Sequence, residues 1–250
     1  MSKTIILFLK YSENELSEKE PLLLGGKTIW TSYEAIKISG NVEPIWDEVK
    51  VIEFSNENEY EKCLNKLKIQ GSTIENYKLL LVDHYPQNMI DMMNTSFKTP
   101  LKSSIDTTPS TNFEDLTSMG INPDSRERLQ ARDKTKPIVV LNFYKFRDIA
   151  LYPDNYGKRK ISGQMAYSKY TKIPLKFFSI YGMEIMVGGN FISSIVGKTE
   201  SKWDSYAFVR YPSLEVLQMM ASTKIYREVL IHREAALEYP VVYISLPSKE

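Results

Sequence analysis

A repeat with a period of 157 residues constrains the fold of this chain more than any other feature of its sequence. Shifting the chain on itself by that period aligns Gly25 with Gly182, Ile38 with Ile195, Gly40 with Gly197, and Trp46-Asp47 with Trp203-Asp204. Both halves then continue with a strand, a turn signal, a helical pattern and a closing apolar strand. The sequence therefore predicts two divergent copies of one α+β unit in tandem.

The order of elements in the second copy indicates which unit is repeated. An apolar strand over 138–143 precedes a helical pattern over 162–181, in which Pro174 is expected to kink or interrupt the helix. Two strands, a second helix and a strand over 241–246 follow, which is the β-α-β-β-α-β order of the ferredoxin-like split motif. Helices cover only one face of such a sheet, so the other face needs a partner. We therefore expect an α+β protein of two tandem ferredoxin-like (βαββαβ) units, whose antiparallel sheets pack face to face as an intrachain dimeric α/β barrel.

The two predicted units differ in completeness. Residues 1–86 form the first unit, which is degenerate because Pro21 interrupts the short stretch available for its first helix. Residues 87–136 form a linker that contains Pro, Ser, Thr and Asn, with a short helix over 124–132. Residues 137–250 form the complete second unit. The expected assembly is a pseudo-dimer within one chain, which could pair further as a homo-oligomer.

The charge balance and the cysteine count narrow the classes of function. The chain has 32 Lys and Arg against 31 Asp and Glu, whereas a nucleic-acid-binding protein is expected to carry a clear basic excess. Cys63 is the single cysteine, so no disulfide forms within the chain, which suits a reducing compartment. The apolar run 4–9 is too short for a signal-peptide core or a membrane span, and indicates a strand. We expect a cytoplasmic protein that binds neither nucleic acid nor membranes.

Several catalytic signatures are missing from the sequence. It contains no GxGxxG, GxxxxGK[ST], GxSxG or HExxH motif. Its two histidines lie 148 positions apart, and together with one cysteine they do not form the ligand pattern of a zinc site. We therefore predict no metal and no cofactor.

Four segments of the second half resemble a known family: PIVVLNFYKFR (137–147), AYSKY (166–170), WDSYAFVRYPS (203–213) and HREAALE (232–238). They are similar to a bacterial family of small dimeric α/β-barrel domains of undefined function. Its superfamily includes cofactor-independent monooxygenases, muconolactone-type isomerases, polyketide cyclases and some haem proteins. The resemblance covers residues 137–246 and implies a ligand pocket between the sheet and its covering helices. It implies no particular reaction, because one fold hosts many chemistries.

His232 is the first candidate catalytic residue. Ile225, Val229, His232 and Ala236 fall at spacings of four, three and four, so the imidazole shares a helical stripe with apolar side chains. An inward histidine at this position could donate or accept a proton near neutral pH. The alternative is a packed histidine with one hydrogen bond, or a solvated one at the edge of the stripe.

Arg147 and Arg210 are candidate catalytic residues that could hold an anionic oxygen. Arg147 lies at the end of a strand, where it could bind a carboxylate or enolate bidentately or pair on the surface with Asp148 or Asp154. Arg210 lies on the same strand face as Tyr206 and Phe208, because every second residue of a strand points to the same side. A charge on such an apolar face must be paired or lie at its edge.

The remaining candidates are expected to bind substrate: Asn142, Tyr144, Tyr167, Tyr170, Phe177 and Tyr206. Asn142 lies in a very apolar run, and an amide there is costly to bury unpaired. It therefore either bonds the backbone of a neighbour or points into a pocket. The tyrosines either line a pocket for an aromatic ligand or fill the core, since the ring packs and the hydroxyl bonds.

The leading hypothesis is a cofactor-independent enzyme of the isomerase, cyclase or monooxygenase type that acts on a small aromatic or oxygenated organic molecule. In it, His232 moves a proton, Arg147 or Arg210 holds an anionic oxygen, and Asn142 orients the substrate. The alternative is a non-catalytic small-ligand-binding or accessory protein of a biosynthetic pathway, which the degenerate first copy favours. A third hypothesis is a haem-binding protein with His232 or His84 as the ligand.

Overall fold

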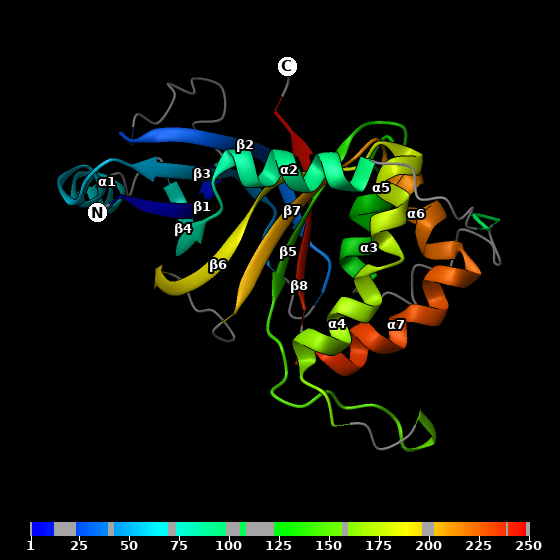
Figure 1. Cartoon of the computed structure of the whole chain (residues 1–250). Helices are drawn as coiled ribbons and strands as arrows, with labels where there is room; N and C mark the ends of the chain where they lie inside the picture. The colour runs from blue at the N-terminus through cyan, green and yellow to red at the C-terminus, as the bar shows by residue number, and fades with distance from the viewer. Residues whose placement is uncertain are drawn as a thin grey trace.

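Eight strands form a single closed antiparallel barrel in a computed structural model of the chain (Figure 1). The structure describes residues 2–12, 24–39, 43–69, 74–98, 106–108, 123–156, 160–196, 203–238 and 240–248. The strands are β1 (Lys3–Tyr11), β2 (Lys27–Lys37), β3 (Trp46–Phe54), β4 (Ile74–His84), β5 (Ile138–Tyr144), β6 (Glu184–Val196), β7 (Ser205–Tyr211) and β8 (Val241–Pro247). Around the barrel they follow the order β1-β3-β2-β8-β5-β7-β6-β4.

The predicted fold, with two ferredoxin-like sheets packed face to face, is wrong. Strand β2 pairs with β8, with Ile36 opposite Ile244, and β4 pairs with β6, with Val82 opposite Phe191. The strands of the two halves therefore continue into one another through backbone hydrogen bonds. Closure removes the sheet edges, whose N–H and C=O groups would otherwise have no partners.

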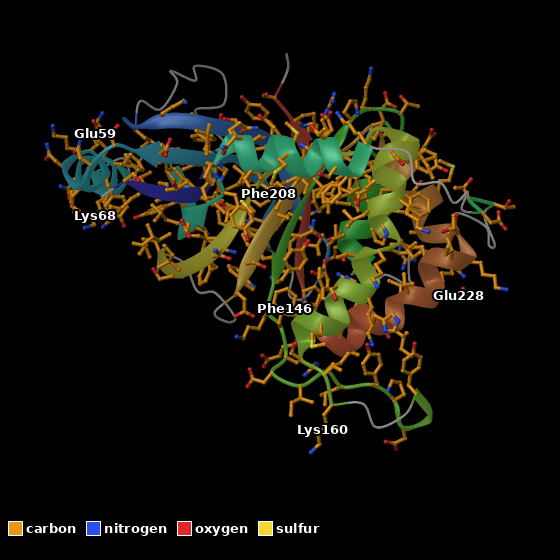
Figure 2. The ribbon with its side chains drawn as sticks, viewed as in Figure 1. Glu59, Lys68, Phe146, Lys160, Phe208 and Glu228 are labelled. Carbon is orange, nitrogen blue, oxygen red and sulfur yellow. The ribbon has the colours of Figure 1, made fainter. Side chains whose placement is uncertain are left out.

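The interior of the barrel is a packed core. Alternation along β5 directs Val139, Leu141 and Phe143 inward, where they are fully buried. The Phe143 ring lies 4.8 Å from that of Trp203 and 6.2 Å from that of Phe8, so side chains from distant strands meet on the barrel axis. Figure 2 shows Phe208 among these strands.

The two Trp-Asp pairs make corresponding structural contacts in the barrel. Both tryptophans are buried within the barrel core. Asp47 accepts a hydrogen bond from the backbone N–H of Tyr11 at 2.7 Å, and Asp204 accepts one from the backbone N–H of Phe146 at 2.7 Å. Each carboxylate thus fixes the backbone at the end of a neighbouring strand.

The helices cover the outside of the barrel unequally (Figure 1). They are α1 (Glu57–Ile69), α2 (Gln87–Lys98), α3 (Pro123–Gln130), α4 (Gly163–Thr171), α5 (Pro174–Tyr181), α6 (Leu214–Ser222) and α7 (Lys224–Ala236). Helices α4 to α7 gather on the side of β5 and β8, whereas α1 lies at the far end of β1 and β3. No helix in the described parts of the chain is long and apolar enough to cross a membrane.

Proline and capping side chains set the helix boundaries next to β5. Pro174 divides the predicted helix 162–181 into α4 and α5, because it has no N–H for the helical ladder. Ser162 caps α4, since its Oγ accepts the Met165 N–H at 3.2 Å.

The segment predicted as a linker contains more regular structure than expected. Helix α3 occupies most of the predicted 124–132 helix, and α2 was not predicted. Phe97 of α2 packs against Phe178 of α5, with ring centroids 5.5 Å apart. The predicted degenerate region near Pro21 and most of the rest of the linker lie outside the described residues. The domain boundaries stay predictions.

Candidate functional site

A cavity of about 450 Å³ separates helices α4 to α7 from the outer face of the barrel. Its floor is formed by β5, β7 and β8, and Ile38 and Ser39, which follow β2, close one side. Ser39 is held there because its Oγ donates to the carbonyl of Pro240 at 2.9 Å. The volume lies within the range of about 300–1,000 Å³ that is typical of small-molecule sites.

Strand alternation selects the residues of the cavity floor. Successive side chains of a strand point to opposite faces, so the neighbours of the inward core residues face the helices. The floor residues are Val140, Asn142 and Tyr144 of β5, Ala207, Val209 and Tyr211 of β7, and Val242 of β8.

Helices α4 to α7 all contribute to the helical wall, and its polar side chains come from one face of α7 and one face of α4. Tyr226, Leu230 and Arg233 line the cavity at spacings of four and three residues, which places them on one side of α7. Tyr167 and Tyr170 line it from α4. Figure 2 shows Glu228 on the opposite, outer side of α7, away from the strands.

Tyrosine hydroxyls pair across the cavity wall. The hydroxyls of Tyr170 and Tyr226 lie 2.9 Å apart, and the ring centroids of Tyr144 and Tyr167 lie 5.1 Å apart. Burial raises the pKa of Tyr144, Tyr167 and Tyr170 above the ordinary value of a phenol. Burial likewise raises the pKa of Tyr211. These groups therefore stay protonated at neutral pH and can donate hydrogen bonds.

Arg233 is a half-buried cation that faces this cavity. Burial lowers the pKa of its guanidinium, but the oxygens of four neighbouring tyrosines raise that pKa by a larger total, so the group stays charged. The four are Tyr170, Tyr226, Tyr167 and Tyr144. No hydrogen bond or ion pair joins the guanidinium to any residue that the structure describes. The wall thus presents a positive charge without a carboxylate partner among the described residues.

Asn142 adds a fixed polar group to the opposite, strand side of the cavity. Its Nδ2 donates to the backbone carbonyls of Val140 and Ala207, at 3.2 Å each. The sequence predicted that this amide either bonds the backbone of a neighbour or points into a pocket, and the structure shows it doing both.

The structure brings together some of the predicted substrate-binding residues. Asn142, Tyr144, Tyr167 and Tyr170 all line the cavity. The two remaining side chains do not line it. Phe177 is fully buried in the core beneath the helices, and Tyr206 lies inside the barrel, because the alternation of β7 directs it inward.

His232, a predicted catalytic residue, does not line the cavity. Its ring contacts two stacked tyrosines instead. Nδ1 lies 2.8 Å from the hydroxyl of Tyr152, and Nε2 lies 3.4 Å from that of Tyr156. Burial lowers the pKa of His232, and the positive charge of Lys169 lowers it further.

Arg147 and Arg210 also lie outside the cavity. Arg147 follows β5, and its Nη2 donates to the backbone carbonyl of Glu238 at 3.4 Å. Arg210 faces away from the cavity on β7, and its Nη1 lies 4.0 Å from a carboxylate oxygen of Glu184. Arg233 is the only arginine among the described residues that line the cavity.

The polar residues at the cavity that the sequence interpretation did not select include Tyr211, Tyr226, Arg233 and Glu234. A signal for Tyr226 and Arg233 was present. Tyr226, Leu230 and Arg233 form a helical stripe one residue displaced from the chosen stripe of His232. One residue is a rotation of about 100° around an α-helix, which is enough to move a side chain from the wall to the outside.

The described residues show no cluster that would hold a metal ion, since no three His, Cys, Asp or Glu side chains gather at one point. Neither His84 nor His232 lines the cavity. The cavity therefore offers no histidine that could serve as the ligand in the haem-binding hypothesis.

No family model and no curated protein matches the chain. Similar solved structures include a protein of unknown function from Rhodopseudomonas palustris, 28% identical over 52% of this chain and 95% of that chain, with a TM-score of 0.45. A candidate monooxygenase from Lactobacillus acidophilus is 11% identical over 99% of this chain and 94% of its own, with a TM-score of 0.42. An anthrone oxidase-like protein is 10% identical over 98% and 91%, with a TM-score of 0.46. The family predicted from the sequence stays a prediction.

Proposed function

We propose that the protein binds a small aromatic molecule with an anionic oxygen in the cavity, and that it acts on this molecule as a cofactor-independent enzyme. The observation that carries the proposal is the position of Arg233, a cation in an aromatic wall with no carboxylate partner among the described residues. A half-buried charge is costly unless it is paired, so the site is complementary to an anion that the ligand supplies. The apolar floor, with Val140 and Val209, suits the ring of such a ligand.

The chemistry that the cavity supports is stabilisation of an enolate or phenolate. The guanidinium of Arg233 and protonated tyrosine hydroxyls surround the position of such an oxyanion, and donors of this kind lower the energy of a developing negative charge. An enolate is the common intermediate of isomerisation and cyclisation, and it is also a form of an aromatic substrate that can react with oxygen. The raised pKa values of the tyrosines make them hydrogen-bond donors rather than bases.

A non-catalytic binding protein is the second candidate, and one specific observation favours it. Glu234 is the only carboxylate among the residues that line the cavity in the described chain, and its side chain is exposed. A base that takes a proton from a bound substrate would have to be this rim residue or solvent.

Replacing Arg233 by methionine tests the anion site. We expect the affinity for 2-naphthoate, measured by fluorescence titration, to fall by about 30-fold or more, since losing one partner of a desolvated charge pair costs at least about 2 kcal/mol. The affinity for neutral 2-naphthylmethanol is expected to stay the same. The melting temperature is expected not to fall, because the guanidinium has no carboxylate partner to lose among the described residues.

Arg147→Met is the matched control, because it removes the same charge from outside the cavity. It is expected to leave the affinity for 2-naphthoate unchanged. Equal losses in the two variants would mean that general charge, rather than the cavity, attracts the anion, and the proposal would be wrong.

Deuterium exchange into 2-tetralone separates the enzyme from the binding protein. If the site stabilises an enolate, the wild-type chain should accelerate exchange at the α-carbon, measured by NMR, and Arg233→Met should abolish the acceleration. Arginine-dependent binding of 2-naphthoate without any accelerated exchange would favour the binding protein.

A further inference from the structure

Only the carbonyl oxygen of the Asn142 amide is available to interact with a ligand. A side-chain amide has two N–H donors and one carbonyl acceptor. Both donors are used, because Nδ2 contacts the carbonyl oxygens of Val140 and Ala207. The acceptor Oδ1 has no hydrogen bond to any residue that the structure describes, while the side chain lines the cavity.

The orientation of this amide is fixed by its neighbours. Rotating it by half a turn would place Oδ1 against the two backbone carbonyls, where three oxygen acceptors would repel one another and no donor would remain. Asn142 lies opposite Ala207 in the β5–β7 ladder, so these carbonyls are held in place by the sheet. The cavity floor therefore presents a permanent acceptor that cannot convert into a donor.

The two sides of the cavity are therefore complementary to different chemical groups of one ligand. The helical side presents the charge of Arg233, together with a hydroxyl pair, Tyr170 and Tyr226, that uses only one of its two protons internally. The strand side presents the acceptor of Asn142. A ligand that carries only a carboxylate or a ketone satisfies the helical side and leaves Oδ1 without a donor.

We infer that Asn142 accepts a hydrogen bond from a hydroxyl group of the ligand, and that the preferred ligands are hydroxylated aromatic anions. This inference rests on the proposed function, because it assigns a second contact to a molecule whose anionic oxygen is held by Arg233. Asn142 is then the residue that determines specificity among aromatic anions. Unsubstituted and methoxylated rings are the disfavoured ligands.

Fluorescence titration of the whole chain with 2-naphthoate and its isomers hydroxylated on the distant ring tests this inference. We expect at least one hydroxy isomer to bind about fivefold to tenfold more tightly than 2-naphthoate, which is the effect of one net hydrogen bond. Its methoxy counterpart should show no such gain. In Asn142→Leu, the hydroxy isomer and 2-naphthoate should bind equally well.

The comparison within each variant keeps the test independent of small changes in folding. Leucine suits this position because Val140 and Val242 surround it on the same face, and Asn142→Val is a second variant with the same expected result. The inference is overturned if no isomer gains affinity, or if the gain survives in both variants. Failure of the proposed function would look different, since 2-naphthoate itself would then bind without dependence on Arg233.

Discussion

Glu43→Gln is expected to lower the free energy of unfolding by about 3–5 kcal/mol, because it removes one member of a buried ion cluster. Glu43 contacts the ammonium groups of Lys37 at 3.0 Å and Lys78 at 2.9 Å, and both lysine side chains are almost completely buried. It also accepts hydrogen bonds from Trp46 Nε1 at 3.0 Å and the Tyr243 hydroxyl at 2.8 Å. This carboxylate thus ties strands of both halves of the barrel together. Urea unfolding measures the loss.

The same cluster predicts a dependence of stability on pH. Burial raises the pKa of Glu43, but Lys78 and Lys37 lower it by more, to about 2. A carboxyl group whose pKa is depressed in the folded state contributes stability above its unfolded pKa of roughly 4.5, and loses that contribution as the pH falls towards 2. In wild type, the free energy of unfolding should therefore fall by about 3 kcal/mol over this window from this group alone. Glu43→Gln should lack that part of the decrease.

Glu57→Gln is the matched control for the buried cluster. Its carboxylate pairs with Lys3 on the surface, and the Glu57 side chain is 56% exposed. Exposed pairs contribute about 1 kcal/mol or less, so this variant should remain close to wild type in stability. Losses of similar size in the two variants would contradict the special role of Glu43.

The sequence predicted local structure better than it predicted how the strands associate. The 138–143 strand, the final strand and the break at Pro174 are all present. The pairing of β2 with β8 was missed for a physical reason. Inward and outward residues alternate in the same way whether two sheets stack or one barrel closes, so the pattern around Ile36 and Ile244 is compatible with both. Only the need to pair exposed sheet edges favours closure.

The sequence pattern placed side chains more reliably along β5 than around α7. The two-residue period of β5 correctly separated Asn142 and Tyr144 from the inward Phe143, because a strand has only two faces. A helix has a continuous circumference, and apolar residues at 225 and 229 made the neighbouring stripe look equally suitable. On that basis His232 was predicted to face the pocket, one position before Arg233. The sequence around Arg233 gives no indication of which side chains surround its guanidinium, because most of those side chains come from α4 and β5, which are far away in the sequence.

Gly163→Ala is expected to destabilise the protein by about 3 kcal/mol and also to weaken ligand binding. Gly163 is the first residue of α4, and its N–H donates to the backbone carbonyl of Arg147 at 2.9 Å. A Cβ at this position would lie closer than 3.0 Å to the carbonyl oxygens of Arg147 and Ala236. These are backbone atoms that cannot rotate away, so α4 itself would have to move. Since α4 carries Tyr167 and Tyr170, the cavity wall would move with it.

The contrast with Gly182→Ala distinguishes close packing from backbone strain. Gly182 ends α5 in the left-handed conformation, with a φ of 69°, and a Cβ there would have no heavy atom within 4 Å. An alanine at that position costs about 1 kcal/mol through its backbone alone, and it leaves α4 in place. Thermal unfolding and 2-naphthoate titration should therefore separate the two variants in stability and in affinity. If Gly163→Ala lowers stability without changing affinity, then α4 does not position the wall of the cavity, and the tyrosines on it are not held by this contact.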